Sequence, residues 1–478
     1  MTKPTRRAFT VSLAAGLAAG LTHAGAASAD ANPYAGTWTG TLAAGPVKLR
    51  LKLVVEAASA TLYSLDQGGG AIPSSALRTD GKLTVEFAVI QARYEATVSG
   101  DTLSGTFTQG GQAMPLEFKR GDVFAGVVPA KPEPVTPALL ERLRSEAHMP
   151  AVAAAWSNDG AAATVLASGR RSATADVAVT PDDLWHLGSI TKSMTATLVA
   201  RMVEKGGITW DTTVGDVLGK AVPKMNPAYA KATFRHLLSH HAGLPGDAGM
   251  SVFWNLPRDD GPDPRADRLR LVAVALGEAP VAGLGEQMVY CNAGFVTAGA
   301  MLEQVYGRPW ESLIQTEVFE PLGLHSAGFG APGHPGKLDQ PLGHRPGPDG
   351  GLLPAEVGPG KLSDNPVAIA PAGRVHMGLS NLVLYLNIHM QQPKTYLLPE
   401  SWEILHTPPF GGNYAMGWVV NDAGQLWHNG SNTLWYAEVV IDPRRKIVAA
   451  AATNDGNLTE AQRAIGTLLQ SAILTAQT

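Results

Sequence analysis

Residues 184–192 read LWHLGSITK, and this stretch decides how the rest of the chain is interpreted. Lys192 is the only lysine in the chain with a serine three positions before it. An apolar pattern predicts a helix over about 189–205, and residues three apart share a helix face, so the Ser189 hydroxyl and Lys192 amine can meet. The Ser189 N–H at the helix start is free to bind an oxyanion. The pair is a candidate nucleophile and base, although S-x-x-K also fits a capping serine followed by a surface lysine.

A second candidate element is Tyr290-Cys291-Asn292, which follows a glycine-containing loop and precedes a predicted helix over 293–306. A phenol held near a lysine can shuttle a proton, and an amide can bind a substrate carbonyl. The Y-x-N pattern recurs at 385–387, but inside an apolar, helix-like run that predicts core packing. Because exposed loops carry functional residues more often than cores do, 290–292 is the better candidate.

A third candidate element is His428-Asn429-Gly430-Ser431, near the end of a predicted strand. A glycine there would let a substrate lie against the strand edge, because no side chain blocks the approach. The backbone N–H of Ser431 could complete an oxyanion hole with that of Ser189. The competing interpretation is an ordinary β-turn, since Asn-Gly is a strong hairpin signal.

Together the three elements resemble the serine β-lactamase and penicillin-binding protein family, whose motifs are S-x-x-K, Y-x-N and K/H-x-G. Their order and spacing are similar to those of its class C-like branch. The flanking sequence resembles the family as well, in the segments 184–189, 236–245, 290–295, 318–324 and 371–380. The resemblance covers about 135–478, and it is far more specific than any one motif.

The resemblance implies a role for each motif residue. Ser189 would be the acylated nucleophile, and Lys192 and Tyr290 would share the general-base and general-acid work. Burial could depress the pKa of the Lys192 amine enough for it to take a proton, but which of the two removes the serine proton stays open. The expected substrate-binding residues are Asn292, His428, Gly430 and Ser431. Asn292 would orient the substrate amide, and the N–H groups of Ser189 and Ser431 would form the oxyanion hole.

Three departures from the family pattern bear on substrate choice. His428 stands where β-lactamases usually have lysine, and an unperturbed imidazole is mostly neutral at pH 7. It would therefore hold a substrate carboxylate weakly, which counts against efficient β-lactamase action. Asn429 replaces the usual Thr or Ser and removes a hydroxyl from that contact. Cys291 replaces the common Ser of the second motif, and its apolar neighbours predict a buried thiol rather than a catalytic one.

The function implied by the resemblance is acyl transfer through a Ser189 ester, with no cofactor and no metal. His236 and His240 are four apart, but the glutamate of H-E-x-x-H is absent. The first expectation is an esterase or a D-amino-acid peptidase or amidase. The alternatives are a penicillin-binding protein or weak class C-like β-lactamase, and a non-catalytic cell-wall binding module. Expected partners are small acyl, peptide or β-lactam-like substrates, with cell-wall peptides among the candidates.

The rest of the chain predicts two folded domains joined by a linker. Over 30–125, apolar residues alternate with polar ones, as in 47–55, and six to eight short strands predict a small all-β, barrel-like domain. Four prolines between 129 and 137 mark a stiff linker, assigned to 126–135. Residues 136–478 show strands at both ends with helices between. This pattern predicts an α/β domain in which one antiparallel sheet is flanked by helices, plus a helical lobe.

The N-terminus and the composition narrow the setting. Residues 1–29 carry Lys3, Arg6 and Arg7, then an Ala/Gly/Leu-rich core and a small-residue site, which predict a twin-arginine-like signal peptide and a periplasmic or secreted protein. A retained N-terminal membrane helix is the alternative; no later span is expected. The net charge of −4 disfavours nucleic acid as a partner, and a single cysteine among 478 residues excludes an internal disulfide.

Overall fold

The computed structural model describes residues 32–475, except 45–46, 58, 66–70, 88–89, 91, 110–111, 126–132, 259–262, 349, 359–360 and 422–423. The expected signal peptide and most of the expected linker lie outside the described residues. The chain divides into an N-terminal unit up to residue 125 and a larger unit from 126 onward, which also takes in 63–72 and 88–91.

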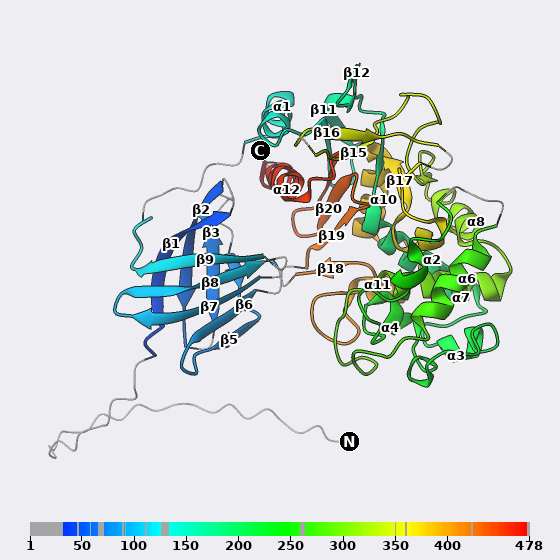
Figure 1. The fold of residues 1–478 in the computed structure, drawn as a ribbon, viewed down its shortest axis with the longest axis horizontal. Coiled ribbons are helices and arrows are strands. Elements are labelled where there is room, and N and C mark those ends of the chain that lie inside the picture. The colour runs from blue at the N-terminus through cyan, green and yellow to red at the C-terminus, as the bar shows by residue number, and fades with distance from the viewer. Residues whose placement is uncertain are drawn as a thin grey trace, which may run out of the picture. The chain divides into compact units, whose positions relative to one another are not determined.

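The strands between residues 36 and 120 form one antiparallel sheet of nine strands in the order β4-β3-β2-β1-β9-β8-β7-β6-β5, which curls into a nearly closed barrel (Figure 1). Its strands are β1 (Gly36–Ala44), β2 (Val47–Val55), β3 (Ala60–Ser64), β4 (Ala71–Pro73), β5 (Ala76–Arg78), β6 (Leu83–Phe87), β7 (Ala92–Ser99), β8 (Thr102–Gln109) and β9 (Gln112–Arg120). Alternate residues of β2, among them Leu51, Leu53 and Val55, are buried inside. The barrel-like prediction is confirmed, with more strands than the six to eight expected.

The larger unit is built on a seven-stranded antiparallel sheet in the order β12-β11-β10-β21-β20-β19-β18. Its strands are β10 (Ala151–Asn158), β11 (Thr164–Ser172), β12 (Ala175–Ala178), β18 (Val419–Val420), β19 (Leu426–Ser431), β20 (Tyr436–Asp442) and β21 (Ile447–Thr453). Strand β10 pairs with β21 from Val152↔Thr453 to Asn158↔Ile447. The prediction that the two ends of this domain meet in one sheet is therefore confirmed.

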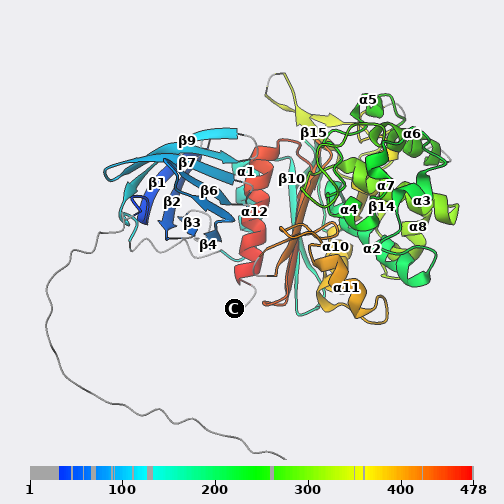
Figure 2. The same ribbon diagram turned by 90° about the horizontal axis from the view of Figure 1, so that it is seen from below.

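Helices cover both faces of this sheet (Figure 2). On one face α1 (Pro137–Glu146) and α12 (Leu458–Thr475) pack against Val152 and Ala154 of β10. On the other face, Ala151 and Ala153 join the core that includes α10 (Leu379–Gln391). The alternation follows from strand geometry, because successive side chains point to opposite faces. Thr136 caps α1, its hydroxyl accepting the N–H of Leu139 at 3.2 Å.

The remaining elements form the helical lobe and the connections to it. The helices are α2 (Thr191–Lys205), α3 (Val214–Leu218), α4 (Phe234–Leu238), α5 (Met250–Phe253), α6 (Arg265–Ala275), α7 (Asn292–Tyr306), α8 (Trp310–Ile314), α9 (Ala370–Gly373) and α11 (Pro399–His406). The short turns are η3 (Gly188–Ile190), η4 (Pro227–Tyr229), η5 (Gln315–Phe319) and η6 (Val367–Ile369). The short strands are β13 (Leu184–His186), β14 (Gly328–Phe329), β15 (Gly343–Pro346), β16 (Leu352–Ala355) and β17 (Val375–Gly378).

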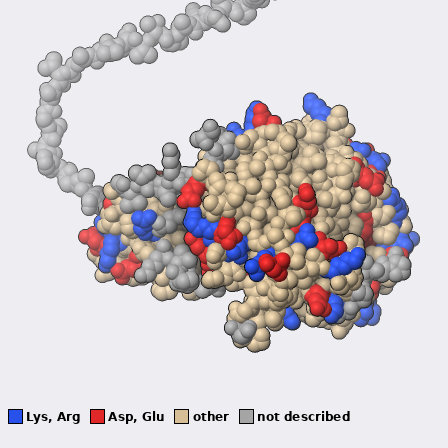
Figure 3. All heavy atoms as spheres, turned by 90° about the horizontal axis from the view of Figure 1, so that it is seen from above, with Lys and Arg blue, Asp and Glu red and all other residues tan. Residues whose placement is uncertain are grey.

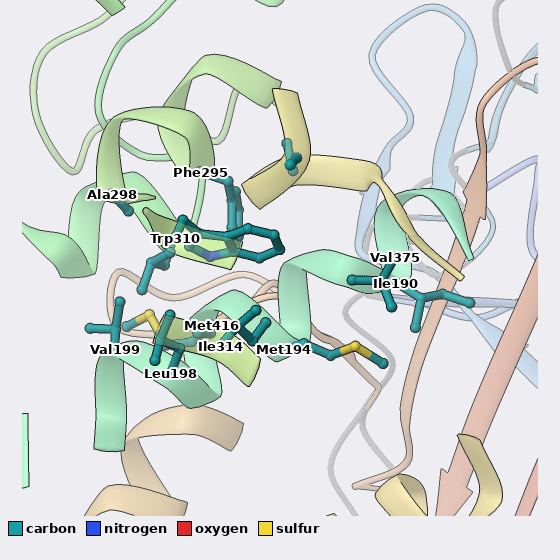
Figure 4. Close-up of a cluster of buried hydrophobic side chains, with 14 of the residues drawn as sticks. Ile190, Met194, Leu198, Val199, Phe295, Ala298, Trp310, Ile314, Val375 and Met416 are labelled. Atoms are coloured by element: carbon teal, nitrogen blue, oxygen red, sulfur yellow. The ribbon is translucent and has the colours of Figure 1, made fainter. Parts of the chain in front are cut away.

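Helix α2 lies at the centre of this unit and is buried on nearly every side. Met194, Leu198 and Val199 contact a cluster that also includes Phe295 and Trp310 (Figure 4). Its buried hydroxyls are bonded within the protein; for example, Thr195 Oγ1 donates to the carbonyl of Pro371 at 2.7 Å. The first turn of such a helix is held rigidly, because its side chains are closely packed and its buried polar groups are already hydrogen-bonded.

Charged side chains are sparse and mixed on the surface. On the face drawn in Figure 3, basic and acidic residues stand next to one another without a continuous basic area. Within the described part of the chain, no helix is long and apolar enough to cross a bilayer.

Candidate active site

The first motif begins at a tight turn. Gly188 has φ +49°, in the left-handed region that glycine adopts without strain, and Ser189 follows it within η3 at the entry to α2. The predicted helix over 189–205 thus starts as one 3₁₀ turn and continues as α-helix. This geometry places the Ser189 hydroxyl and its free N–H at the end of a buried helix.

Lys192 meets the serine as the i, i+3 spacing predicts. Its Nζ lies 2.8 Å from Ser189 Oγ, 2.8 Å from Asn292 Oδ1 and 2.8 Å from the carbonyl oxygen of Ala372. The side chain is fully buried, and burial lowers the pKa of the amine to about 7. When the amine loses one proton, its lone pair can face the Ser189 hydroxyl. The surface-lysine interpretation of S-x-x-K is therefore wrong for this motif.

Tyr290 completes the group around the serine. Tyr290 is 40% exposed, and the Ser189 side chain is close enough to influence the pKa of its hydroxyl. The Lys192 ammonium lies 4.9 Å from the centre of the Tyr290 ring. Desolvation raises the pKa of this phenol by more than the Ser189 side chain lowers it, so the phenol stays protonated at neutral pH. Ser189, Lys192, Tyr290 and Asn292, up to 103 positions apart in the sequence, are thus brought together.

The third motif places two backbone amides side by side. A Cβ on Gly430 would overlap the carbonyl oxygen of Leu187 and the amide nitrogen of Ser189. A Cβ on Gly188 would likewise overlap the amide nitrogen of Ser431. Only glycines allow η3 and β19 to approach this closely. The segment is a strand paired with β20, so the isolated β-turn interpretation is wrong.

His428 does not have the environment expected of a carboxylate-binding residue. It is 3% exposed, its Nδ1 donates to the carbonyl of Asn429 at 2.5 Å, and its Nε2 accepts the Tyr414 hydroxyl at 2.8 Å. Burial, and next the nearby Lys192 charge, lower its pKa to about 3. A neutral ring with both nitrogens occupied offers no cation. The assignment of His428 to substrate binding stays a prediction; in the structure its side chain is bonded to Tyr414 and to the Asn429 carbonyl.

Two residues behind the site were not identified from the sequence. Tyr414 is buried between His428 and His240, whose ring centre lies 4.6 Å away. His240 accepts the Cys291 N–H at Nδ1 over 3.1 Å, and its ring centre lies 4.2 Å from that of Tyr290, with the two rings tilted by 38°. Tyr414 has no spacing signal in the sequence, and His240 stands there in a segment that resembles the family, without a predicted contact to the second motif. Both support the second motif from behind.

The other candidates have structural positions. Cys291 is 2% exposed, and burial raises the pKa of its thiol, as its apolar neighbours predicted. Tyr385 and Asn387 of the second Y-x-N lie in the buried part of α10. No group of three or more potential metal ligands occurs among the described residues. His236 accepts the backbone N–H of Thr233 at 3.2 Å and thereby caps α4.

The chain is similar to known proteins of more than one kind. Penicillin-binding protein 4 of Amycolatopsis lactamdurans is 28% identical over 336 residues, which cover 66% of this chain and 84% of that protein. Esterase EstB of Burkholderia gladioli is 31% identical over 157 residues, or 31% of this chain and 39% of the esterase. The chain is thus similar both to a penicillin-binding protein and to an esterase.

A solved structure shows the same fold. The D-amino acid amidase of Ochrobactrum anthropi SV3 matches with a TM-score of 0.57 and 19% identity, covering 72% of this chain and 98% of the amidase. The Beta-lactamase family model matches residues 137–472, well over half of the chain. Relatives in this family include esterases, amidases and penicillin-binding proteins, which are serine hydrolases. The chain belongs to the Beta-lactamase family.

Proposed function

We propose that this chain hydrolyses small esters or amides through a covalent acyl group on Ser189. The observation that carries the proposal is the 2.8 Å contact between Ser189 Oγ and the fully buried Lys192 amine, whose pKa is lowered to about 7. An amine with this pKa is both abundant in its neutral form and basic enough to take a proton near pH 7.

The proposed reaction has two acyl-transfer steps. Ser189 Oγ attacks the substrate carbonyl carbon as its proton passes to neutral Lys192 Nζ, and the resulting oxyanion is bound by the N–H groups of Ser189 and Ser431. The tetrahedral species collapses, expelling the alcohol or amine, which leaves with a proton supplied through Tyr290. Water then attacks the ester, losing a proton to the same groups, and releases the acid and free Ser189. The raised pKa of Tyr290 favours Lys192 as the base and Tyr290 as the donor.

The substrate class we propose is an acyl compound without a free carboxylate next to the cleaved bond. His428 is neutral and bonded on both nitrogens, so it supplies no positive charge. Esters and primary amides, including those of D-amino acids, meet this condition, and the names of the esterase and amidase relatives support it. Penicillin binding is the second candidate, favoured by the match to a penicillin-binding protein over 66% of the chain.

The experiment that tests this proposal is covalent labelling of the purified protein. A fluorophosphonate probe is expected to label the wild-type chain at Ser189, and a panel of p-nitrophenyl esters is expected to be hydrolysed. Ser189→Ala should abolish both signals, because it removes the hydroxyl that is bonded to the buried Lys192 amine. Labelling by fluorescent penicillin, without ester turnover, would favour the penicillin-binding candidate. A folded wild-type protein that neither reacts nor turns over would end the proposal.

The pH dependence of the reaction follows from the state of Lys192. Since the amine must be neutral to accept the serine proton, kcat/KM is expected to rise about tenfold per pH unit up to pH 7 and then to level off. His428, with its pKa near 3, and Tyr290, with its raised pKa, do not titrate in this range. Initial rates with an uncharged ester between pH 5.5 and 8.5 measure the profile. A flat profile over that range would contradict a base with this pKa.

The proposed substrate class predicts a preference between paired compounds. The amide of an N-acyl-D-alanine is expected to be turned over at least about tenfold faster than the corresponding dipeptide with a free carboxylate, because an unpaired carboxylate loses solvation without gaining a cation. This ratio should not change between pH 6 and 8, since His428 stays neutral throughout. Steady-state kinetics on both compounds gives the ratio. A clear preference for the free carboxylate would show that another residue supplies positive charge.

A further inference from the structure

Asp364 is a buried carboxylate that lies outside all three motifs. Its side chain is 4% exposed, and both of its oxygens accept hydrogen bonds. Oδ2 accepts from His186 Nε2 at 3.1 Å and Arg374 Nε at 3.1 Å; Oδ1 accepts from Asn432 Nδ2 at 2.9 Å and the Asn365 N–H at 2.7 Å. Burial alone would raise the pKa of this carboxyl. His186 and Arg374 lower it by a larger amount, so the net shift is downward and the carboxyl stays ionised.

One of these bonds leads to the turn that carries Ser189. The N–H of Gly188 donates to His186 Nδ1 at 3.1 Å, so the ring proton is on Nε2, where it is donated to Asp364. Asp364 thereby fixes both the tautomer and the orientation of His186. The ring in turn holds the left-handed Gly188 turn, and the amide of the next residue, Ser189, takes its direction from that turn.

A second bond leads to the residue after Ser431. Asn432 is 3% exposed, and while its Nδ2 donates to Asp364, its Oδ1 accepts the N–H groups of Leu434 at 3.1 Å and Trp435 at 3.2 Å. The Trp435 ring also stacks on His186, with ring centres 5.5 Å apart. The chain just after Ser431 is therefore tied to the same carboxylate as the chain just before Ser189.

We propose that Asp364 is a positioning residue that sets the distance and direction of the Ser189 and Ser431 amides as a pair, acting through His186 and Asn432. The inference rests on the proposed function, in which those amides bind the oxyanion. Its bonds to His186 and to Asn432 connect it to the backbone on both sides of the site. An oxyanion hole stabilises the transition state only when both donors point at the same atom, so a shared anchor serves that need.

The substitution Asp364→Asn tests the inference with almost no change in shape. An amide accepts at one oxygen only, so its NH₂ group must face donors on one side, either His186 and Arg374 or Asn432. We expect kcat for p-nitrophenyl butyrate to fall about 10- to 100-fold with KM within threefold of wild type. The inhibition constant of phenylboronic acid, whose tetrahedral adduct places an oxygen between the two amides, should rise by the same factor as kcat falls.

Asp442→Asn is the matched control. Asp442 is also a buried carboxylate, 1% exposed, bonded to Arg445 and Gln425 at the far end of β20. It should lose a comparable amount of thermal stability while kcat and boronate affinity stay unchanged. If Asp364→Asn does not fold, Asn432→Ala, which removes one arm only, carries the test with the same expected link between kcat and boronate affinity.

The results separate this inference from the proposed function. A wild-type chain without turnover would overturn the proposed function and this inference together. An active wild type with Asp364→Asn unchanged, or with boronate affinity unaltered while kcat falls, would overturn only the positioning role. In the double variant Asp364→Asn with Asn432→Ala, kcat should match the lower of the single variants, since both changes break one chain of contacts. Full additivity would also count against a shared path.

Discussion

We expect the replacement of Lys192 with Arg or with Met to lower kcat/KM for a p-nitrophenyl ester by about 10³-fold. A decrease of this size lies within the range found when a general base is lost. Arg keeps the positive charge but does not deprotonate, so it tests the need for a neutral amine. Met keeps most of the volume but no donor, leaving Ser189 Oγ, Asn292 Oδ1 and the Ala372 carbonyl without their shared partner. Stopped-flow acylation rates and melting temperatures on both variants separate chemistry from folding.

Lys205→Met is the matched control for this prediction. Lys205 is the last residue of the same helix, is partly exposed, and pairs with Glu317 at 2.5 Å. Its removal should leave kcat/KM within about twofold, because Lys205 lies at the opposite end of α2 from Ser189. A Lys192→Arg protein with near wild-type acylation would mean that a permanently charged side chain suffices, and Tyr290 would then have to be the base.

Much of the site could be predicted because its motifs are local. The i, i+3 spacing of Ser189 and Lys192 requires only a helix, and the buried, uncharged run after it makes that helix certain to pack inside. The pairing of β10 with β21 follows from strands at both ends of a domain with helices between. Distances within one element follow from sequence, since the geometry of helices and strands is fixed.

The electrostatics of the site could not be predicted in the same way. The pKa of His428 depends on its burial and on the charge of Lys192, and its hydrogen-bond partner Tyr414 reaches it from an irregular loop. The link from Asp364 to Asn432 joins residues 68 positions apart, with no periodic signal between them. A pKa is set by the groups that surround a residue in space. The third motif therefore predicts that a histidine is present, but not its charge.

Gly430→Ala is expected to reduce kcat/KM by about 10²- to 10³-fold, the cost of losing one donor of an oxyanion hole. The new methyl group would overlap backbone atoms of Leu187, Gly188 and Ser189, none of which can rotate away as a flexible side chain could. Strand β19 must therefore move from η3, and the Ser431 amide moves with it. We expect the fluorophosphonate to label Ser189 much more slowly while KM changes little, measured beside the melting temperature.

Gly466→Ala provides the comparison that isolates this effect. Gly466 lies inside α12, where an added Cβ would meet nothing within 4 Å, so alanine should raise the free energy of unfolding by roughly 0.5–1 kcal/mol and leave kcat/KM unchanged. Together the two variants show whether a methyl group acts through backbone separation at the site. If Gly430→Ala kept wild-type kcat/KM, the Ser431 amide would not be an oxyanion donor. Stabilisation of a tetrahedral intermediate would then rest on Ser189 alone, and Asp364 would have no pair of amides to align.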